Sequence, residues 1–551
     1  MHWRPRTAWT FVCGCALAGG CATKSPLPDG VFIRAPIAPP QLSPPPKPAG
    51  LPAPPVVPAA GTKPVEARPG DPNGPLALGE VLNSVDAAFP LLYAIEQERA
   101  IAAGQRLAAE GGFDPVIRAR GVDQGGTFSS TRLDAGVEQA TPFGGVSTFA
   151  GWRHGTGNFP IYYGERKTGD GGEYRAGVNV PLLQNRDIDP RRARLRAAQI
   201  SERLADPIVR RARLDFQRAA AQSYWTWQAA GSQYRVADDL VRLARARQAL
   251  LDERFKEKLV GETVPVLNRR LIASREETLL AADRALQQSA LRLSLYLRDP
   301  AGNPVVPTAE WLLPSFPDLR PPLPDAAQLQ SDVAAALAQR PELVRFQLEK
   351  ERRAVELQLA TNQLSPALNA YAQVAQDAGA AKKTFTGTGP FATDRTTAEI
   401  GATFEMPLPF RNARGLTNVA QAQLAQLLAQ ERFARDEITA QVQDAVSELV
   451  LTYRRVEKAR EELKHAVRVL ELETESFKGR QTSLVELNLQ EIAAAEARVK
   501  VVAVLGAYFG AVANYRAALG LDGPAGAGAV LPRTEPGPTA PAMPPPVEPK
   551  P

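Results

Sequence analysis

Residues 442–477 read VQDAVSELVLTYRRVEKAREELKHAVRVLELETESF and decide how the chain folds. Within them an apolar side chain recurs at alternating steps of four and three residues, and only Arg460 and Thr474 interrupt the series. A 3.5-residue repeat sustained over about ten turns is typical of helices that pack as coiled coils. The stretch therefore predicts a long helix with one apolar face that needs a partner helix. The series consists of Val442, Val446, Leu449, Tyr453, Val456, Arg460, Leu463, Val467, Leu470, Thr474 and Phe477.

A second series of the same kind lies in the first half of the chain, where only Ser223 and Gln248 interrupt it. From Pro190 to Lys256 such a helix would be about 100 Å long at ~1.5 Å per residue, and compact domains rarely contain helices of that length. Pro207 lies inside it, and we expect this proline to kink the helix or divide it. The series consists of Phe216, Ala220, Ser223, Trp227, Ala230, Tyr234, Ala237, Val241, Ala244, Gln248, Leu251 and Phe255.

The two halves repeat one order of elements, which indicates an internal duplication. Each half begins with helices, in which Pro90 or Pro341 is followed by another proline at the same spacing, Pro115 or Pro366. Alternating strands then lead into the long helix, a glycine-containing break and a return helix. The return helices carry a looser series at residues 272–297 and a regular one formed by Val501, Leu505, Tyr508, Val512, Tyr515 and Leu519.

The strand segments have one apolar and one polar face, for example residues 174–180, 368–374 and 398–406. This pattern suits a membrane barrel with lipid outside and water inside, and it equally suits a half-buried soluble sheet. The first half has a longer stretch between its prolines at 115 and 181 than the second has between 366 and 407. The extra alternating segments at residues 131–153 are expected either to lengthen the rim of a barrel or to form an external hairpin.

Proline-rich segments lie at both ends: 17 of the 49 prolines fall between Pro26 and Pro75, and 10 follow Gly523. Such segments bury too little apolar area to offset the entropy of ordering. We therefore predict a disordered linker at residues 22–75 and a disordered tail at residues 522–551.

The segment from Met1 to Cys21 has the pattern of a secretion signal, with Arg4 and Arg6 before a short apolar region. The sequence Leu17-Ala18-Gly19-Gly20-Cys21 resembles a bacterial lipobox, which predicts that Cys21 is lipidated, although Ala18 stands where leucine is usual. A plain signal cleavage after Ala18, or a lipobox ending at Cys15, remains an alternative. No later stretch has ~18 consecutive apolar residues, so we expect no membrane helix.

No residues suited to catalysis, metal binding or cofactor binding stand out. All three cysteines lie at or before Cys21, and His2, His154 and His465 are far apart in the sequence. The net charge of +6 and an arginine cluster at residues 191–196 carry no nucleic-acid fold signature. We therefore expect a protein that is not an enzyme, has no cofactor or metal, and binds no nucleic acid.

The doubled order of elements resembles the TolC-like outer-membrane efflux family over about residues 76–521. No single motif carries the resemblance, but the order of several does. They are Pro181-Leu182-Leu183, Pro407-Leu408-Pro409-Phe410 with Gly415, the breaks after Phe255 and Phe477, and the return helix that contains Tyr508 and Tyr515.

The resemblance implies an internally duplicated α+β membrane protein, with a long antiparallel α-helical coiled-coil barrel and transmembrane β-barrel strands. It also implies a trimer in which each chain gives four strands to a twelve-stranded barrel. The expected domains are a first repeat at residues 76–298, an equatorial linker at 299–325 and a second repeat at 326–521.

The resemblance further implies that the two helix reversals contact an adaptor protein, whereas ordinary surface turns are the alternative. Gly261 and Gly479 are expected to supply the unusual backbone of these tips. Glu486 is expected to line the constriction of the channel, with a solvated helix glutamate as the alternative, and Asn488 and Leu489 stand where a second acid is expected. The tip residues are Leu259, Val260, Gly261, Glu262 and Thr263 in the first half, and Gly479, Arg480, Gln481, Thr482 and Ser483 in the second.

The implied function is that of the outer-membrane channel in a tripartite export system. The implied partners are two further copies of the chain, a periplasmic membrane-fusion adaptor, an inner-membrane pump and outer-membrane lipid. The implied location is the bacterial outer membrane, with an N-terminal lipid anchor and an extension into the periplasm. Drugs, metal ions and proteins all remain open as substrates. A lipid-anchored structural coiled coil that spans the periplasm without channel activity is the alternative, but it leaves the strands and the duplication unexplained.

Overall fold

The structure is a computed structural model that describes residues 74–159, 167–317, 324–379, 396–479 and 481–522. All of these belong to one compact unit, Pro64–Pro551. The predicted signal with Cys21, nearly all of the two proline-rich segments, and Arg480 lie outside the described residues.

The described elements follow the duplicated order, and the predicted mixed α+β fold is confirmed. The first half contains α1 (Leu78–Ala88), α2 (Pro90–Glu110), β1 (Val116–Gln124), β2 (Ser130–Ala140), β3 (Ser147–Gly157), β4 (Glu173–Pro181), α3 (Pro190–Lys256) and α4 (Thr263–Leu293). The second half contains α5 (Ala326–Gln339), α6 (Pro341–Asn362), β5 (Ala367–Asp377), β6 (Thr396–Glu405), α7 (Arg411–Lys478) and α8 (Leu484–Ala518). Short 3-10 turns lie at Gly111–Phe113 and Ala309–Trp311.

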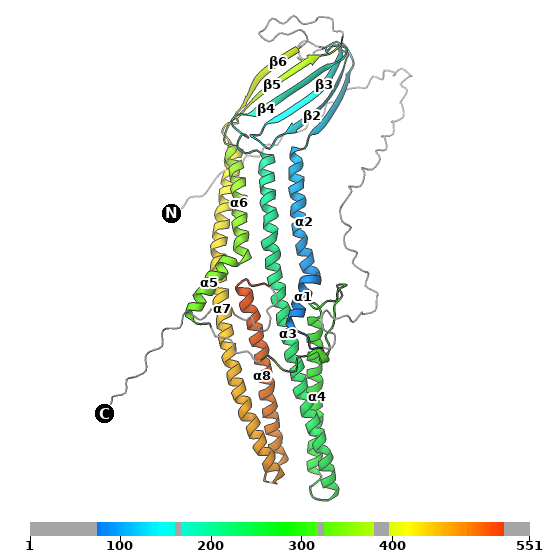
Figure 1. The fold of residues 1–551 in the computed structure, drawn as a ribbon, viewed down its shortest axis with the longest axis vertical. Helices are drawn as coiled ribbons and strands as arrows, with labels where there is room; N and C mark the ends of the chain where they lie inside the picture. Colours follow the sequence, from blue (N-terminus) through cyan, green and yellow to red (C-terminus); the bar gives the residue numbers. More distant parts are fainter. Residues whose placement is uncertain (1–73, 160–166, 318–323, 380–395, 480, 523–551) are drawn as a thin grey trace, which may run out of the picture. The chain divides into compact units, whose positions relative to one another are not determined.

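The two long helices form antiparallel hairpins with their return helices, α3 with α4 and α7 with α8, and α3 also packs against α2, α6 and α8 (Figure 1). Helix α3 is a single helix that runs through the buried Pro207, so the alternative in which this proline divides it is wrong. A proline removes one backbone hydrogen bond from a helix. Packing against several neighbouring helices outweighs that loss.

The apolar series of α7 faces its neighbours as predicted. Val442, Val446, Leu449 and Val456 are buried, and the members from Leu463 to Phe477 are half-buried. The hydrophobic core is therefore a helical seam, densest in the middle of the hairpins.

Aromatic rings fill this middle region. Trp225 of α3 stacks on Phe509 of α8 with ring centroids 4.0 Å apart, and Phe316 of the linker between the halves stacks on both. Leu312 of the same linker packs onto Gly231, where an added Cβ would lie 2.3 Å from the leucine side chain. The linker is thus held against α3 and α8 by close apolar contacts.

The six strands form one antiparallel sheet in the order β1-β2-β3-β4-β5-β6 (Figure 1). The extra segments of the first half are β2 and β3, and they lie inside the sheet, between β1 and β4. The expectation that they form an external hairpin is therefore wrong. The reason is their period-two alternation, which continues the two faces of the neighbouring strands.

Register separates the residues of the sheet onto two faces. One row of register partners is entirely apolar and consists of Ile117, Val137, Ala150, Ala176, Val374 and Ala398. A row on the opposite face is entirely charged and consists of Arg120, Asp134, Arg153, Glu173 and Asp377. The sheet therefore has an apolar face and a charged face across its width.

Candidate functional site

The apolar face of the sheet is open to its surroundings. Ile117, Ile400 and Phe404 are 83%, 78% and 64% exposed, so the described residues do not cover this face. A contiguous exposed apolar surface is typical of a site that contacts another protein or a membrane. This exposure argues against the half-buried soluble sheet, in which the same side chains would lie under helices.

The opposite face carries ion pairs between strands, two of them between neighbouring strands and one that reaches from β4 across β3 to β2. Arg118 pairs with Glu138 at 2.9 Å, Arg175 lies 3.5 Å from Asp134, and Arg153 pairs with Glu173. At the far side of the sheet, the Tyr371 hydroxyl and the Gln373 amide donate to Glu399 at 2.9 and 2.6 Å. Charged groups at this density need water, so the two faces require different solvents.

The strands have the length that a bilayer requires. They contain 9 to 11 residues. At ~3.3 Å per residue and a tilt of ~40°, such strands cross about 25 Å of hydrocarbon.

Aromatic side chains lie near both ends of the apolar face. Trp152 and Tyr174 are register partners near one end, and the Trp152 indole donates to the Gly171 carbonyl at 2.9 Å. Phe404 is exposed near the other end. Aromatic belts at both interfaces are typical of membrane-spanning sheets.

A hollow of about 710 Å³ lies on the charged face, above β1 to β4. Gly136 and Gly151 face each other across β2 and β3 in its floor. A Cβ on Gly151 would lie 2.8 Å from the Ala135 carbonyl oxygen. Glycines on one face let a sheet bend toward that face, so the charged side is the side that can curve inward.

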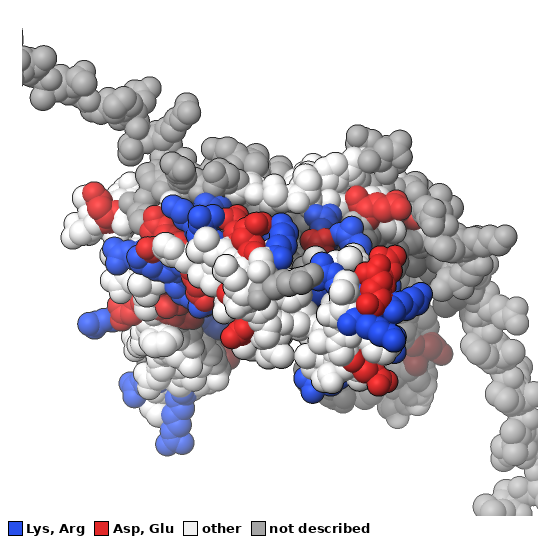
Figure 2. Space-filling view, turned by 90° about the horizontal axis from the view of Figure 1, so that it is seen from below, with Lys and Arg blue, Asp and Glu red and all other residues white. Residues whose placement is uncertain are grey.

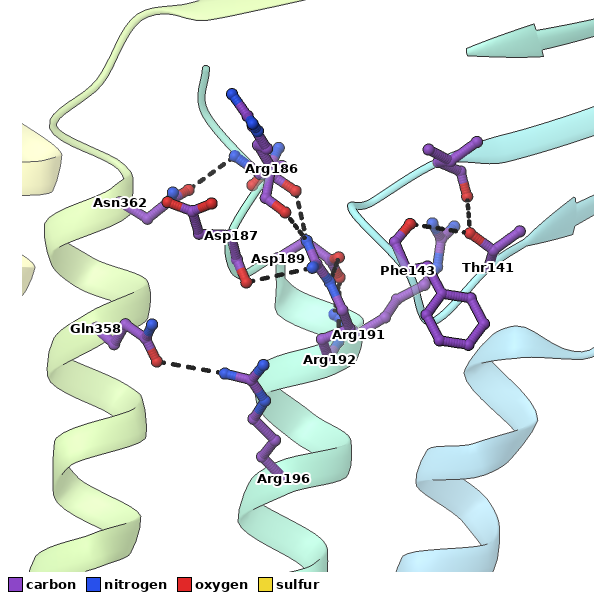
Figure 3. A network of polar contacts seen from close by, with 12 residues as sticks. Thr141, Phe143, Arg186, Asp187, Asp189, Arg191, Arg192, Arg196, Gln358 and Asn362 are labelled. Atoms are coloured by element: carbon purple, nitrogen blue, oxygen red, sulfur yellow. Dashed lines mark hydrogen bonds and ion pairs between the residues drawn. The ribbon is translucent and has the colours of Figure 1, made fainter. Parts of the chain in front are cut away.

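A buried arginine fixes the path from the sheet into α3 (Figure 3). Asp189 caps α3 by accepting from the backbone N–H groups of Arg191 and Arg192, and it pairs with the Arg192 guanidinium at 2.6 Å. The guanidinium also donates to the carbonyl oxygens of Asn185, Arg186 and Asp187 at 2.6, 2.9 and 3.2 Å. The strand exit predicted at residues 181–183 therefore leads into a turn that the hydrogen bonds of Arg192 hold in place.

Arg196 of this cluster makes a contact within the chain as well. Figure 3 shows Arg196 of α3 reaching across to Gln358 of α6, with a donor–acceptor distance of 3.4 Å. Contacts within the chain therefore account for the positions of Arg192 and Arg196.

The first helix reversal lies between α3 and α4, at the end of the hairpins away from the sheet (Figure 1). Its left-handed residue is Lys258, with φ 56°, and Gly261 is not among the described glycines with positive φ. The expectation that Gly261 supplies the unusual backbone is therefore wrong. Leu259 is 59% exposed at this tip, next to the half-buried Val260 and the exposed Glu262.

The second reversal ends in a capping box. Gly479 ends α7 with φ −73°, so it does not supply unusual backbone either. Ser483 accepts from the Glu486 backbone N–H through its hydroxyl at 3.3 Å, and its own backbone N–H donates to the Glu486 carboxylate at 2.9 Å. Hydrogen bonds from the Ser483 backbone and then its hydroxyl lower the pKa of Glu486. Glu486 therefore holds the start of α8 and remains ionised at neutral pH.

A buried ion cluster above the tips joins the two hairpins. The Glu491 carboxylate of α8 is 3% exposed and pairs with Arg247 of α3 and, at 2.7 Å, with Arg275 of α4. Arg247 also donates to the Asn488 amide oxygen at 3.0 Å, and Arg275 donates to the Leu240 carbonyl at 3.0 Å. This cluster links α8 to both helices of the first hairpin through buried charges.

The sequence analysis missed this cluster, although the sequence carries a signal for it. The apolar series of the return helix, extended toward its start by the same steps of three and four, passes through Glu491. A charged residue at a seam position indicates a buried partner of opposite charge. Glu491 follows residues 488 and 489 by less than one turn, but its carboxylate is buried in this cluster.

The surface at the tips carries both signs of charge. Figure 2 views the unit from below, the tip end in Figure 1, and shows Lys and Arg interspersed with Asp and Glu. No group of three or more His, Cys, Asp or Glu within the described ranges is placed to hold a metal ion. Within those ranges no single helix is long and apolar enough to cross a membrane, while the bent pair Leu78–Ala88 and Pro90–Phe113 meets those criteria together.

No family model matches the sequence, and the curated proteins likewise yield no match. Solved structures do match. The Campylobacter jejuni CmeC outer membrane channel has TM-score 0.55 and 15% identity, covering 80% of this chain and 85% of that one. The Vibrio cholerae outer membrane protein VceC has TM-score 0.55 and 16% identity, covering 80% and 96%.

The open state of the Neisseria gonorrhoeae MtrE outer membrane channel has TM-score 0.56 and 13% identity, covering 81% of this chain and 89% of that one. In each case the alignment covers most of both chains, so the likeness includes the sheet and the long helices together. The chain therefore has the fold of the TolC-like outer-membrane channels.

Proposed function

We propose that the protein is the outer-membrane channel of a tripartite export system, and that three copies form one passive exit duct. The observation that carries this proposal is the sheet, which presents an exposed apolar face and a charged face across all its strands. Lipid would cover the first face and water would fill the space beside the second.

In this proposal the chain performs no chemistry. The sheets of three copies wall a pore through the outer membrane, and the helical hairpins continue it as a tunnel into the periplasm. A solute then needs only an open path. Substrate choice among drugs, metal ions and proteins rests with the inner-membrane pump.

The tips are the proposed contact for the periplasmic adaptor. They lie at the end of the hairpins away from the sheet, and the exposed Leu259 offers an apolar contact there. Residues 259–263 and 479–483 form this surface. Lipidation of Cys21 would add a second attachment to the outer membrane, besides the sheet itself.

Opening of the duct requires the hairpins to separate at the tips. The Arg247–Arg275–Glu491 cluster opposes such separation, because pulling α8 away leaves buried charges without partners. Adaptor binding at the tips would have to overcome this link.

Three copies of the ionised Glu486 would form a negative ring at the tip end of the tunnel. Such a ring attracts cations and repels anions at short range. Glu486 also caps α8, so its charge and its capping role have to be separated. Glu486→Gln removes the charge and keeps a residue suited to the capping box, whereas Ser483→Ala weakens the cap and keeps the charge.

We expect Glu486→Gln to weaken block of the channel by divalent cations, and Ser483→Ala to leave that block in place. The measurement is single-channel current with and without the cation on the tip side. Equal block in the wild type and Glu486→Gln would remove Glu486 from the constriction.

The proposed function is tested with the purified full chain in a planar bilayer. A trimeric duct gives stepwise increases of conductance with a reproducible unit size. A periplasmic structural coiled coil without channel activity gives none, even when it binds the membrane. Absence of steps from trimeric, membrane-inserted protein would contradict the proposal.

A further inference from the structure

The two edges of the sheet have no strand partner within the described chain. β1 and β6 end the six-strand order, and most of their residues are exposed. In hydrocarbon, unpaired backbone N–H and C=O groups are too costly to persist, so both edges need another strand. Six strands are also too few to close around a water-filled bore.

We propose that β1 of one copy pairs with β6 of the next copy, so that three copies close a barrel of eighteen strands rather than twelve. This inference rests on the proposed trimeric duct and adds the number of strands and the interface between copies. The additional strands are β2 and β3, which lie within the sheet and carry both of its faces.

Strand direction permits this closure. Every neighbouring pair in the sheet is antiparallel, so β1 and β6 run in opposite directions. A ring of identical six-stranded sheets therefore closes with antiparallel pairs throughout. An odd number of strands per copy would have forced a parallel pair at each junction.

The two edges also have complementary charges on the face that would line the water-filled lumen. β1 carries Arg118 and Arg120 there, and β6 carries Glu399 and Glu405. Arg120 and Glu405 are exposed and have no ion pair among the contacts of the described residues. Pairing of the edges places arginines of one copy beside glutamates of the next, which favours the contact between unlike edges.

The stagger of the strands fits a barrel as well. The row of register partners that begins at Val116 crosses the sheet to Glu399, six residues before the end of β6 at Glu405. If Val116 of the next copy lies level with Glu405, as symmetry about the pore suggests, each copy contributes six residues of stagger over six strands. At ~3.3 Å per residue and ~4.8 Å per strand the tilt is about 35°, within the range of membrane barrels.

This register specifies which residues of β1 and β6 lie opposite each other. Residues that point into the lumen must face each other, so even-numbered residues of β1 lie opposite odd-numbered residues of β6. With Val116 opposite Glu405, Arg118 lies opposite Thr403. The barrel would have roughly one and a half times the diameter of a twelve-stranded one, because diameter grows with strand number.

The first test is oxidative crosslinking in the full chain, whose own cysteines all lie at or before Cys21. We expect Arg118→Cys combined with Thr403→Cys to give covalent dimers and trimers. Arg118→Cys with Ala402→Cys is the matched control, because Ala402 lies on the opposite face, and its yield should be at least tenfold lower. Crosslinks to position 401 or 405 would also support the interface, with a register shifted by two. Crosslinks to none of positions 401, 403 and 405 would overturn it.

The second test asks whether β2 and β3 are in the wall. Ala119→Cys with Ala135→Cys should crosslink within one chain, because these residues are register partners. Ala119→Cys with Ala176→Cys should not crosslink, because β2 and β3 separate β1 from β4. The reverse result, together with labelling of Ala135→Cys by a water-soluble maleimide, would place the hairpin outside the wall and overturn the eighteen-stranded barrel.

The proposed duct and the proposed eighteen-stranded barrel can be contradicted by different results. A twelve-stranded wall leaves the trimer and its stepwise conductance intact and changes only the crosslinks. If the protein without introduced cysteines formed no trimer and gave no conductance, the proposed duct would be contradicted, and with it the interface.

Discussion

At the scale of single residues, Glu491 has the clearest energetic role. Among the described residues its carboxylate is the only acidic partner of the Arg247 and Arg275 guanidinium groups, and all three side chains are buried or nearly so. Removing one member of a buried ion pair leaves an uncompensated charge, which typically costs about 3–5 kcal/mol.

We therefore expect Glu491→Gln to lower the free energy of unfolding by about that amount and to speed hydrogen exchange at the start of α8. Glu496→Gln, an exposed site on the same helix, is the control and should change neither. The measurement is exchange by mass spectrometry together with thermal unfolding. Equal behaviour of the two variants would show that the cluster does not hold the hairpins.

Tyr508 makes the stability of the helical middle sensitive to alkaline pH. Burial, with a smaller contribution from Tyr453, raises the pKa of Tyr508 from 10.0 to about 12. The folded state therefore keeps the phenol proton longer than the unfolded state does. The resulting stabilisation is fully present below pH 10.0 and is lost as the pH rises through about 12.

Over that window we expect the wild type to lose about 3 kcal/mol more than Tyr508→Phe, which has no proton to release. At neutral pH the substitution should cost little, because the buried Tyr508 hydroxyl has no hydrogen-bond partner among the described residues. Tyr93→Phe, at an exposed tyrosine, should follow the wild type. Parallel pH curves for all three proteins would contradict the assignment.

At the scale of elements, the paired glycines of β2 and β3 control how the sheet bends. A Cβ on Gly151 would meet the Ala135 carbonyl oxygen at 2.8 Å and the Gly136 Cα at 3.1 Å. These are backbone atoms, which cannot swing away as a side chain can. Gly151→Ala should therefore force the two strands apart and cost about 1–3 kcal/mol.

The measurement for Gly151→Ala is the temperature at which the proposed trimer dissociates in detergent, which we expect to fall. Gly125→Ala is the matched control, since a Cβ there meets nothing within 4 Å. An unchanged dissociation temperature for Gly151→Ala would mean that the close approach of β2 and β3 is not required.

The elements also show what the sequence could and could not predict. The long helices were predictable because their apolar repeat is local, and each residue's position in it can be counted from the chain alone. The place of β2 and β3 was not, because strand order depends on pairing between segments far apart in the chain, such as Tyr174 with Gln376. The resemblance to a family with four strands in each chain predicted a sheet without β2 and β3.

The tips illustrate the same limit at smaller scale. Glycine marks both breaks correctly, but the left-handed residue of the first tip is Lys258. The choice among neighbouring residues depends on how α3 and α4 meet, which no local pattern reports. Glu491 is the opposite case, because counting along the return helix would have found it at a seam position.

At the scale of the whole molecule, the sheet and the helical hairpins have to form one continuous path. In the proposed ring of three copies, the sheet has lipid on one face, water on the other and a strand partner at each edge. The hairpins then need only to continue the same bore, with their tips available to an adaptor.

The central claim is most directly tested by electron cryo-microscopy of the full chain purified in detergent, with a cross-section taken through the sheet. The account predicts threefold symmetry and eighteen strands around an open lumen, with Arg120, Asp134 and Glu173 on the inner wall and Ile117 and Ile400 on the outer wall. A map in which the sheets of the copies stay separate, or in which the apolar face lines the interior, would contradict it.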